Sequence, residues 1–286
     1  MSGLELVKKL REETGAGILA CQKALKDTNN DYESAIDLLR KQGAAKAMSK
    51  ADRVASDGLC GVCSTNDGIS VVKLNCETDF VAKNAKFQQL LSIIANTALN
   101  AECNDVNALL TKTNNGKTIQ ELITEGIAAI GENIVLSDVK TYKLQSEQKV
   151  VYYVHNQVEG NNNLGRIVSL TISQGDDSDE GALLLKQINM HIAAMSPIAL
   201  TEKDIPDDIL NRERAIYQEQ VQQLNKPSEI AAKMVEGKMR KFYEENVLLK
   251  QIFVLDNKNS VANVISDFNK KHNTSLELLT FCRFAI

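Results

Sequence analysis

Two pairs of residues have the types and spacing that catalysis uses. Cys60 and Cys63 have the C-x-x-C spacing of redox and zinc sites, and Asp79 with His191 could supply a general acid and a general base. The three-residue offset puts the two thiols on opposite faces of the strand expected there. No second such cysteine pair lies nearby, and the sequence lacks a glycine-rich phosphate loop. An enzyme is therefore the least favoured class, and we expect no metal and no cofactor.

A third group of residues could act by contact with a partner. A strand with Val72, Leu74 and Cys76 on its buried face runs into a polar corner, Thr78-Asp79-Phe80-Val81, and an amphipathic helix follows. Two positions are open to Phe80. Either it packs inward as a helix staple while Asp79 caps the helix, or it stays exposed beside a carboxylate.

Composition and charge limit the class of protein. A length of 286 residues predicts about two domains, and the 33 basic and 37 acidic residues are interspersed, with a net charge of -4. Without a basic tract, nucleic acid is not an expected direct partner. The sequence lacks both the apolar run of a membrane span and the apolar core of a secretion signal. Six scattered cysteines suit a reducing compartment, so we expect a soluble, cytoplasmic protein with no membrane partner.

Residues 1–42 are predicted to form a compact unit of three helices. Ile18 and Leu19 come at the very start of the second helix, ahead of its inner stripe. They either pack under the bundle as a hydrophobic loop or stay exposed as a partner contact. In the second case Lys8 and Arg11, on the neighbouring helix, would be rim charges around that contact.

The remainder of the chain predicts two related α+β core subdomains. After a linker at 43–57, the first subdomain covers residues 58–148 and contains a hairpin turn, Asn66-Asp67-Gly68. The second covers 149–206 and 251–286 and repeats the order of hairpin and helix, which suggests an internal duplication. The expected strands are 59–65, 69–76, 134–144, 150–158, 166–173, 251–255 and 276–285, with an open loop at 159–163, and the expected helices include 118–130, 181–195 and 260–271.

His191 falls outside the apolar stripe of the helix expected at 181–195, on the flank of the helix and near its C-terminus. A histidine in such a place is typically a surface residue, because a helix C-terminus favours imidazolium in any protein.

Residues 207–250 predict an inserted antiparallel coiled-coil hairpin. Apolar residues recur at steps of three, four and seven along two polar helices that break at Asn225-Lys226-Pro227. So narrow a stripe leaves most of each helix in water, and the arm is expected to project from the body. Tyr217, Met239 and Phe242 are expected to face solvent and to be candidates for contact with a second copy.

Four ordered motifs resemble the elongation factor Ts family over nearly the full chain. They are residues 6–17, similar to the family's opening ubiquitin-associated-like module; residues 75–83, with its T-D-F-V-A-K signature; residues 190–194, similar to a helix of its second core subdomain; and residues 226–239, similar to the turn and second helix of its coiled coil. The resemblance implies the same order of module, two core subdomains and coiled-coil insertion. Some members of the family continue into a C-terminal helix that makes a further contact with their partner, a GTPase. This sequence stops at Ile286. Exchange of the nucleotide bound to the GTPase is therefore expected to run through the module and the core.

The resemblance further implies a guanine nucleotide exchange factor of translation elongation. Its expected partner is elongation factor Tu, in the GDP-bound and the nucleotide-free state, and the resemblance allows a homodimer within a heterotetramer. The residues implied are Thr78, Asp79, Phe80 and Val81 for a contact that displaces magnesium in the GTPase, and Lys8, Arg11, Ile18, Leu19 and His191 for further partner binding.

One alternative from another class stays open. The N-terminal helices are also typical of a non-catalytic, ubiquitin-associated-like adaptor or scaffold, with the coiled coil as its assembly arm. An adaptor would leave the rate of GDP release from the GTPase unchanged, so that measurement separates the two hypotheses.

Overall fold

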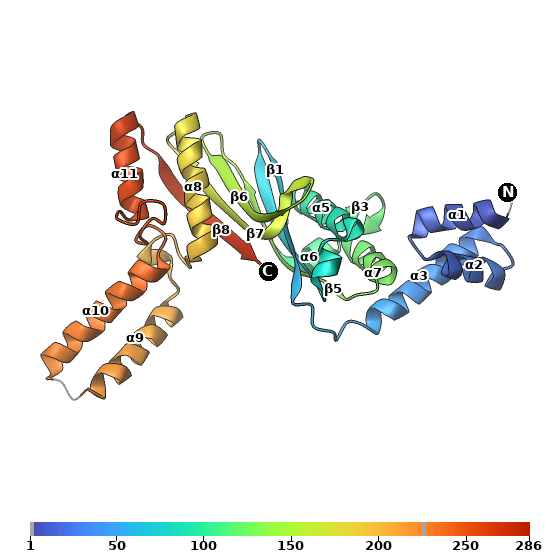
Figure 1. Cartoon of the computed structure of the whole chain (residues 1–286), viewed down its shortest axis with the longest axis horizontal. Coiled ribbons are helices and arrows are strands. Elements are labelled where there is room, and N and C mark those ends of the chain that lie inside the picture. The colour runs from blue at the N-terminus through green and yellow to red at the C-terminus, as the bar shows by residue number, and fades with distance from the viewer. Residues whose placement is uncertain (1–2, 225–226) are drawn as a thin grey trace. The chain divides into compact units, whose positions relative to one another are not determined.

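The computed structural model describes residues 3–224 and 227–286. The chain forms two compact units (Figure 1). Unit 1 contains the chain up to Leu144, Val154–Val168 and Phe284–Ile286, and unit 2 contains Gln145–Tyr153 and Ser169–Arg283. The mixed helical and sheet fold predicted from the sequence is confirmed, and within the described residues no helix is long and apolar enough to cross a membrane.

The first three helices of unit 1 pack around a small core of their own. They are α1 (Gly3–Thr14), α2 (Ile18–Asp27) and α3 (Tyr32–Met48), and we call them the N-terminal module. Their buried side chains include Leu10, Cys21, Ala24, Leu25, Ala35, Ile36 and Leu39. The third helix continues past the expected end at residue 42, because the alanine-rich segment that follows has a high helix propensity.

The remainder of unit 1 is an antiparallel sheet covered by helices. Its elements are β1 (Asp57–Thr65), β2 (Gly68–Cys76), α4 (Asp79–Ala82), α5 (Ala85–Asn100), α6 (Val106–Leu110), β3 (Thr113–Asn114), β4 (Lys117–Thr118), α7 (Ile119–Ile130) and β5 (Ile134–Lys143). The strand order is β5-β2-β1, and β1 pairs on its other side with β7 (Asn161–Gln174). Gly61 allows α5 to approach the sheet closely, since a Cβ atom there would lie 2.8 Å from Leu91 Cγ.

Unit 2 contains parts of β6 (Lys149–Val158), β7 and β8 (Glu277–Ala285), and β7 pairs with both of the others. The helices are α8 (Asp179–Met195), the 3-10 helix η1 (Glu202–Asp204), α9 (Asp207–Gln222), α10 (Ser228–Asn246) and α11 (Val261–His272). The largest core cluster of this unit joins α8 and α11 through Leu185, Ile188, Ile192, Val261 and Ile265.

Two expectations for the second half of the chain are wrong. The open loop at 159–163 is instead a tight turn, because Gly160 takes a left-handed φ of 77° and β7 begins at Asn161. Residues 251–255 do not form the expected strand: Ile252 makes only an isolated bridge with Ser260, and a turn begins at residue 254. Asp256 accepts hydrogen bonds from the backbone N–H groups of Lys258 and Asn259, and this closes the chain locally.

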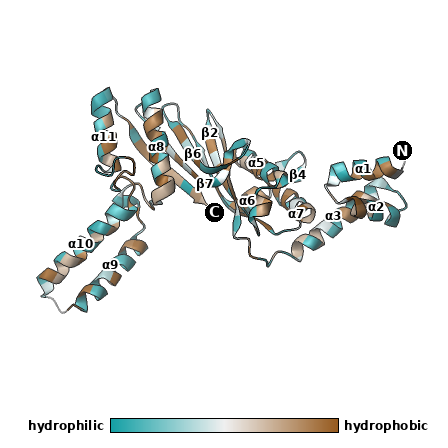
Figure 2. Ribbon diagram, in the orientation of Figure 1, coloured by the Kyte–Doolittle hydropathy of each residue, from teal (hydrophilic) through white to brown (hydrophobic). Residues whose placement is uncertain are grey.

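The two helices of the arm, α9 and α10, lie side by side in Figure 1, and hydrophilic and hydrophobic residues alternate along both (Figure 2). The expectation that Met239 and Phe242 face solvent is wrong, because they are 1% and 8% exposed and pack with Val221 and Val235. The exposed apolar residues of the arm are Ile216, Leu224 and Ile230. Asn225 and Lys226, where the sequence predicts the break, lie outside the described residues. The coiled-coil geometry stays a prediction.

Candidate functional site

The polar corner at residues 78–81, hereafter the corner, lies where β2 ends and the single-turn helix α4 begins. Val81 and Ala82 are 7% and 5% exposed and pack into the core of unit 1. Since successive residues of a helix are about 100° apart around its axis, Phe80 then faces outward, and it is 78% exposed. The inward staple is therefore wrong for Phe80, and the exposed position is confirmed.

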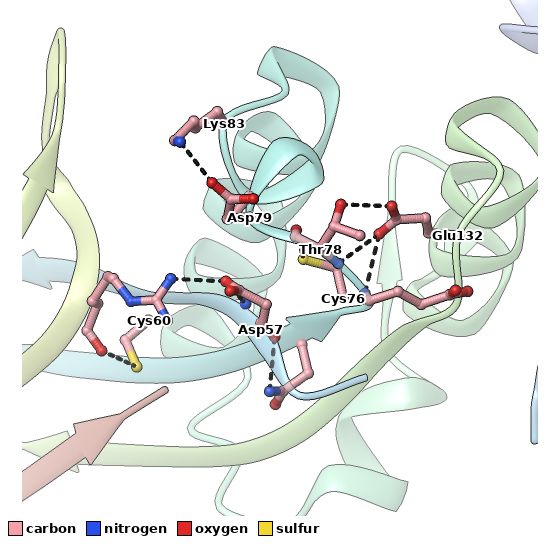
Figure 3. A network of polar contacts seen from close by, with 12 residues as sticks. Asp57, Cys60, Cys76, Thr78, Asp79, Lys83 and Glu132 are labelled. Atoms are coloured by element: carbon pink, nitrogen blue, oxygen red, sulfur yellow. Dashed lines mark hydrogen bonds and ion pairs between the residues drawn. The ribbon is translucent and has the colours of Figure 1, made fainter. Parts of the chain in front are cut away.

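Hydrogen bonds from two successive residues fix the corner to the chain after α7 (Figure 3). The hydroxyl of Thr78 donates to Glu132 Oε1 at 2.7 Å, and the backbone N–H groups of Glu77 and Thr78 donate to Glu132 Oε2 at 3.1 and 3.0 Å. Sequence reasoning missed Glu132 because it lies far from the corner along the chain. The glycine before it was the available signal, since glycine commonly ends a helix and turns the chain.

A charged pair accompanies the exposed ring. Lys83 Nζ donates to Asp79 Oδ2 at 2.7 Å (Figure 3) and lies 6.0 Å from the centre of the Phe80 ring. The hydrogen bond and the positive charge of Lys83 hold the pKa of Asp79 below its ordinary value. The corner thus presents an apolar ring beside an ionised carboxylate.

Three thiols of the β1–β2 hairpin make hydrogen bonds within the fold. Burial, together with the negative charges of Asp57 and Glu132, raises the pKa of Cys76 to about 12, so this thiol stays protonated and donates to Thr78 O at 3.2 Å. Cys60 is fully buried and donates to a backbone oxygen, whereas Cys63 contacts the side chain of an asparagine on α5 at 3.7 Å. Among the described residues, no three His, Cys, Asp or Glu side chains are grouped as metal ligands would be.

The N-terminal module presents an exposed apolar pair. Gly15 takes a left-handed φ of 68° and ends α1, and its N–H donates to Arg11 O at 2.9 Å. The chain then restarts so that Ile18 and Leu19 form the first turn of α2, where they are 49% and 81% exposed. They do not pack under the bundle, and the side chains of Lys8 and Arg11 on the same module are also exposed.

His191 is fully buried in unit 2, so the expectation of a surface position is wrong. Its Nδ1 accepts from the N–H of Val254 at 3.3 Å, which leaves the proton on Nε2 to donate to Gln251 Oε1 at 2.9 Å. Residues 251–254 thus cover the helix flank that the sequence analysis left open. Burial lowers the pKa of His191, and the ring presents no surface to a partner.

The exposed ring on a fixed corner and the exposed apolar pair on a helical module define a protein that works through contact with another macromolecule. The sequence places it more narrowly. The family model described as "Elongation factor TS" matches residues 77–286, and the chain belongs to the elongation factor Ts family.

Relatives that carry the name "Elongation factor Ts" match nearly the full chain. That of Bartonella henselae is 42% identical over 98% of this chain and 91% of its own length. That of Wolbachia pipientis subsp. Culex pipiens is 43% identical over 91% of this chain and 90% of its own. That of Rhizorhabdus wittichii is 44% identical over 98% and 91%. Membership of this family does not favour the adaptor alternative.

Proposed function

We propose that this chain binds elongation factor Tu and promotes the release of its GDP, as a guanine nucleotide exchange factor in translation elongation. The observation that supports this best is the 78% exposure of Phe80 on a corner held by hydrogen bonds. Burying such a ring in a groove of the partner returns about 2 to 3 kcal/mol. That free energy becomes available only in the complex, where it can deform the groove.

The mechanism needs no covalent step. A GTPase holds GDP through backbone amides, a lysine and a bound magnesium ion. A protein that binds the nucleotide-free GTPase more tightly than the loaded one weakens nucleotide binding by the same factor. Asp79 and Phe80, flanked by Thr78 and Val81, enter the GTPase and disturb the elements that hold magnesium and phosphate.

The other predicted residues supply affinity. Ile18 and Leu19 dock a ubiquitin-associated-like module on a second helix of the GTPase, with Lys8 and Arg11 at the rim of the contact. His191 acts from inside unit 2, because its two ring nitrogens hold the segment 251–254 that covers it.

The arm serves assembly in this proposal. Ile216, Leu224 and Ile230 are exposed on an arm whose remaining apolar residues are mostly turned inward. Contact between two such arms would join two copies of the chain, each with its GTPase, into a heterotetramer. The nucleotide-exchange step does not depend on this contact.

Release of labelled GDP from elongation factor Tu, measured with and without this protein, tests the function. We expect release to become faster with concentration and then to saturate. The affinity of the chain for the nucleotide-free GTPase should exceed its affinity for the GDP-bound form by the factor by which GDP affinity falls. Binding without any change in the rate of GDP release would instead support an adaptor.

A further inference from the structure

We propose that Glu132 is a positioning residue for nucleotide exchange: it holds the corner in the orientation that projects Phe80, an inference that rests on the proposed exchange function. Its carboxylate accepts three hydrogen bonds, two from the backbone and one from a hydroxyl. Bonds to an ionised acceptor are roughly twice as strong as neutral ones. All three come from Glu77 and Thr78, directly before the residues that project.

The end of α7 explains why Glu132 reaches the corner. Gly131 takes a left-handed φ of 95° and its N–H donates to Ile127 O at 2.9 Å, which closes the helix and reverses the chain. The next residue but one, Asn133, is 4% exposed and donates its N–H to Glu77 Oε1 at 2.7 Å. The residues before and after Glu132 are therefore both held by hydrogen bonds, and this limits the positions open to its side chain.

The side chain of Asn133 extends the same connection toward the N-terminal module. Its Nδ2 donates to Arg53 O at 2.8 Å and to Ala51 O at 3.3 Å, in the segment between α3 and β1. Arg53 in turn forms an ion pair with Glu77 at 3.5 Å. The loop 131–133 thus holds both the corner and the segment that follows the module.

The corner needs an external support because α4 cannot hold itself. A helix of one turn is far shorter than the length at which helices become stable in water. Thr78 is its N-cap residue but makes no side-chain bond to the helix, since its hydroxyl is bound to Glu132. Without Glu132, burial of Val81 and Ala82 would be the main remaining restraint on the direction of Phe80.

A purely structural role and a positioning role differ in what they predict for exchange. A structural residue stabilises the folded chain, and its loss leaves exchange unchanged at temperatures well below melting. A positioning residue acts inside the bound complex, where GDP leaves only while Phe80 is inserted. Its loss lowers the saturating rate of GDP release and leaves the half-saturating concentration, set by other contacts, nearly unchanged.

The test uses the full chain with Glu132→Ala, Glu132→Gln and a matched control, Glu121→Ala. Glu121 also accepts from a backbone N–H and a hydroxyl, both of Thr118 at 2.7 and 3.1 Å, but at the opposite end of α7. We expect Glu132→Ala to lower the saturating rate about tenfold, as for a competent fraction near one tenth. Glu132→Gln, which keeps an acceptor oxygen for the two amides and can reorder its bond to Thr78, should restore most of the rate, and Glu121→Ala should leave the rate unchanged.

Combining Glu132→Ala with Phe80→Ala shows whether Glu132 acts through the ring. We expect no further loss in the double variant, because there is then no ring to position. An equal loss in both backgrounds, or a saturating rate unaffected by Glu132→Ala, would overturn the proposal.

Amide hydrogen exchange at Thr78 in the unbound protein separates this inference from the proposed function. We expect faster hydrogen exchange at this amide in Glu132→Ala than in the unaltered chain, whether or not the protein acts on a GTPase. Unchanged protection of that amide would show that Glu132 does not order the corner. If the Thr78 amide is protected from hydrogen exchange in the unaltered chain, but that chain does not accelerate GDP release, the nucleotide-exchange function is refuted instead.

Discussion

At the scale of single residues, Phe80 and Phe87 have the same side chain but opposite surroundings. Phe80 is 78% exposed on α4, whereas Phe87 is fully buried on α5 against the sheet of unit 1. The free energy of burying Phe87 is therefore gained on folding. That of Phe80 is gained only when a partner covers it.

Phe80→Ala should slow saturating GDP release by about tenfold or more. A tenfold change corresponds to an activation free energy for GDP release higher by roughly 1.4 kcal/mol. The free energy of unfolding should fall by less than about 1 kcal/mol. Phe87→Ala is the matched control and should cost about 3 to 5 kcal/mol of stability. GDP release and urea unfolding of both variants provide the measurement. A core-sized loss of stability in Phe80→Ala would contradict the exposed position.

The direction of Phe80 could not be predicted from the sequence near it. The pattern around residues 72–81 correctly predicts a strand followed by a corner, because alternation and capping are local properties. Which way a single helical turn faces depends on the burial of Val81 and Ala82 in the core and, in our proposal, on Glu132, which only the folded chain brings to Thr78. For His191 the same holds, since the segment that buries it lies in a distant part of the chain.

The buried His191 should make unit 2 sensitive to acid. Its pKa is lowered in the folded chain by burial, so the unfolded chain takes up the proton first. The stability that depends on the neutral ring is complete above the unfolded pKa of about 6.5 and is lost as pH falls from there toward the folded pKa, by at most about 1.4 kcal/mol per pH unit.

His191→Phe tests this because phenylalanine keeps a ring beside Phe253 but cannot titrate. At neutral pH the variant should be less stable, since Gln251 and Val254 lose their partner. Its deficit relative to the unaltered chain should shrink as pH falls below about 6.5. Urea unfolding at several pH values measures the difference, and a deficit independent of pH would mean that the imidazole does not carry this acid sensitivity.

At the scale of elements, the N-terminal module exposes large apolar residues in more than one place, including the starts of its first two helices. Leu19 lies in the first turn of α2 and Leu4 in the first turn of α1, and they are 81% and 78% exposed. Exposure alone does not distinguish them, so the proposed docking role of α2 needs a comparison between the two.

Leu19→Ser should raise the half-saturating concentration for exchange by about tenfold, since burying a leucine at an interface contributes about 1.5 to 3 kcal/mol. The saturating rate should stay the same, because the corner performs the displacement. Leu4→Ser is the control and should change neither quantity. Equal effects of the two substitutions would show that the start of α2 is not a specific contact.

The elements themselves follow well from local patterns where turn chemistry is strong. Asn66-Asp67-Gly68 predicts the hairpin of β1 and β2, and the structure pairs Thr65 with Gly68 across it. The prediction fails at 251–255, where Gln251 and Phe253 are buried and Ile252 between them is exposed, which is the alternation of a strand. Pairing there stops at a single bridge between Ile252 and Ser260, so no strand forms.

At the scale of the whole molecule, the arm of α9 and α10 can be deleted without loss of core residues only if the ends of the deletion are well chosen. Leu248 is fully buried in the main core of unit 2, and Val247 packs with Phe242 and Ile205 at the base of the arm. A deletion across the predicted insertion, 207–250, would therefore remove core residues. A shorter deletion avoids this.

Replacing residues 212–240 with a Gly/Ser linker should leave the remainder of the chain folded and GDP release largely intact, and should reduce self-association. Ile216→Ser combined with Ile230→Ser should reduce self-association without shortening the arm. Sedimentation and GDP release of both variants test whether the arm serves self-association and the remainder of the chain serves nucleotide exchange. Loss of exchange from a folded, shortened chain would make the arm part of the exchange surface.

The division into units also has a consequence for how the chain is made. Unit 1 includes Val154–Val168 and Phe284–Ile286, and within it the N–H of Ile286 donates to Arg166 O at 3.0 Å. A ribosome adds roughly 5 to 20 residues per second from the N-terminus onward. All the unit 2 residues between Ser169 and Arg283 are therefore synthesised before residues 284–286 of unit 1. Unit 1 must wait several seconds, nearly complete, for residues that are synthesised after those of unit 2.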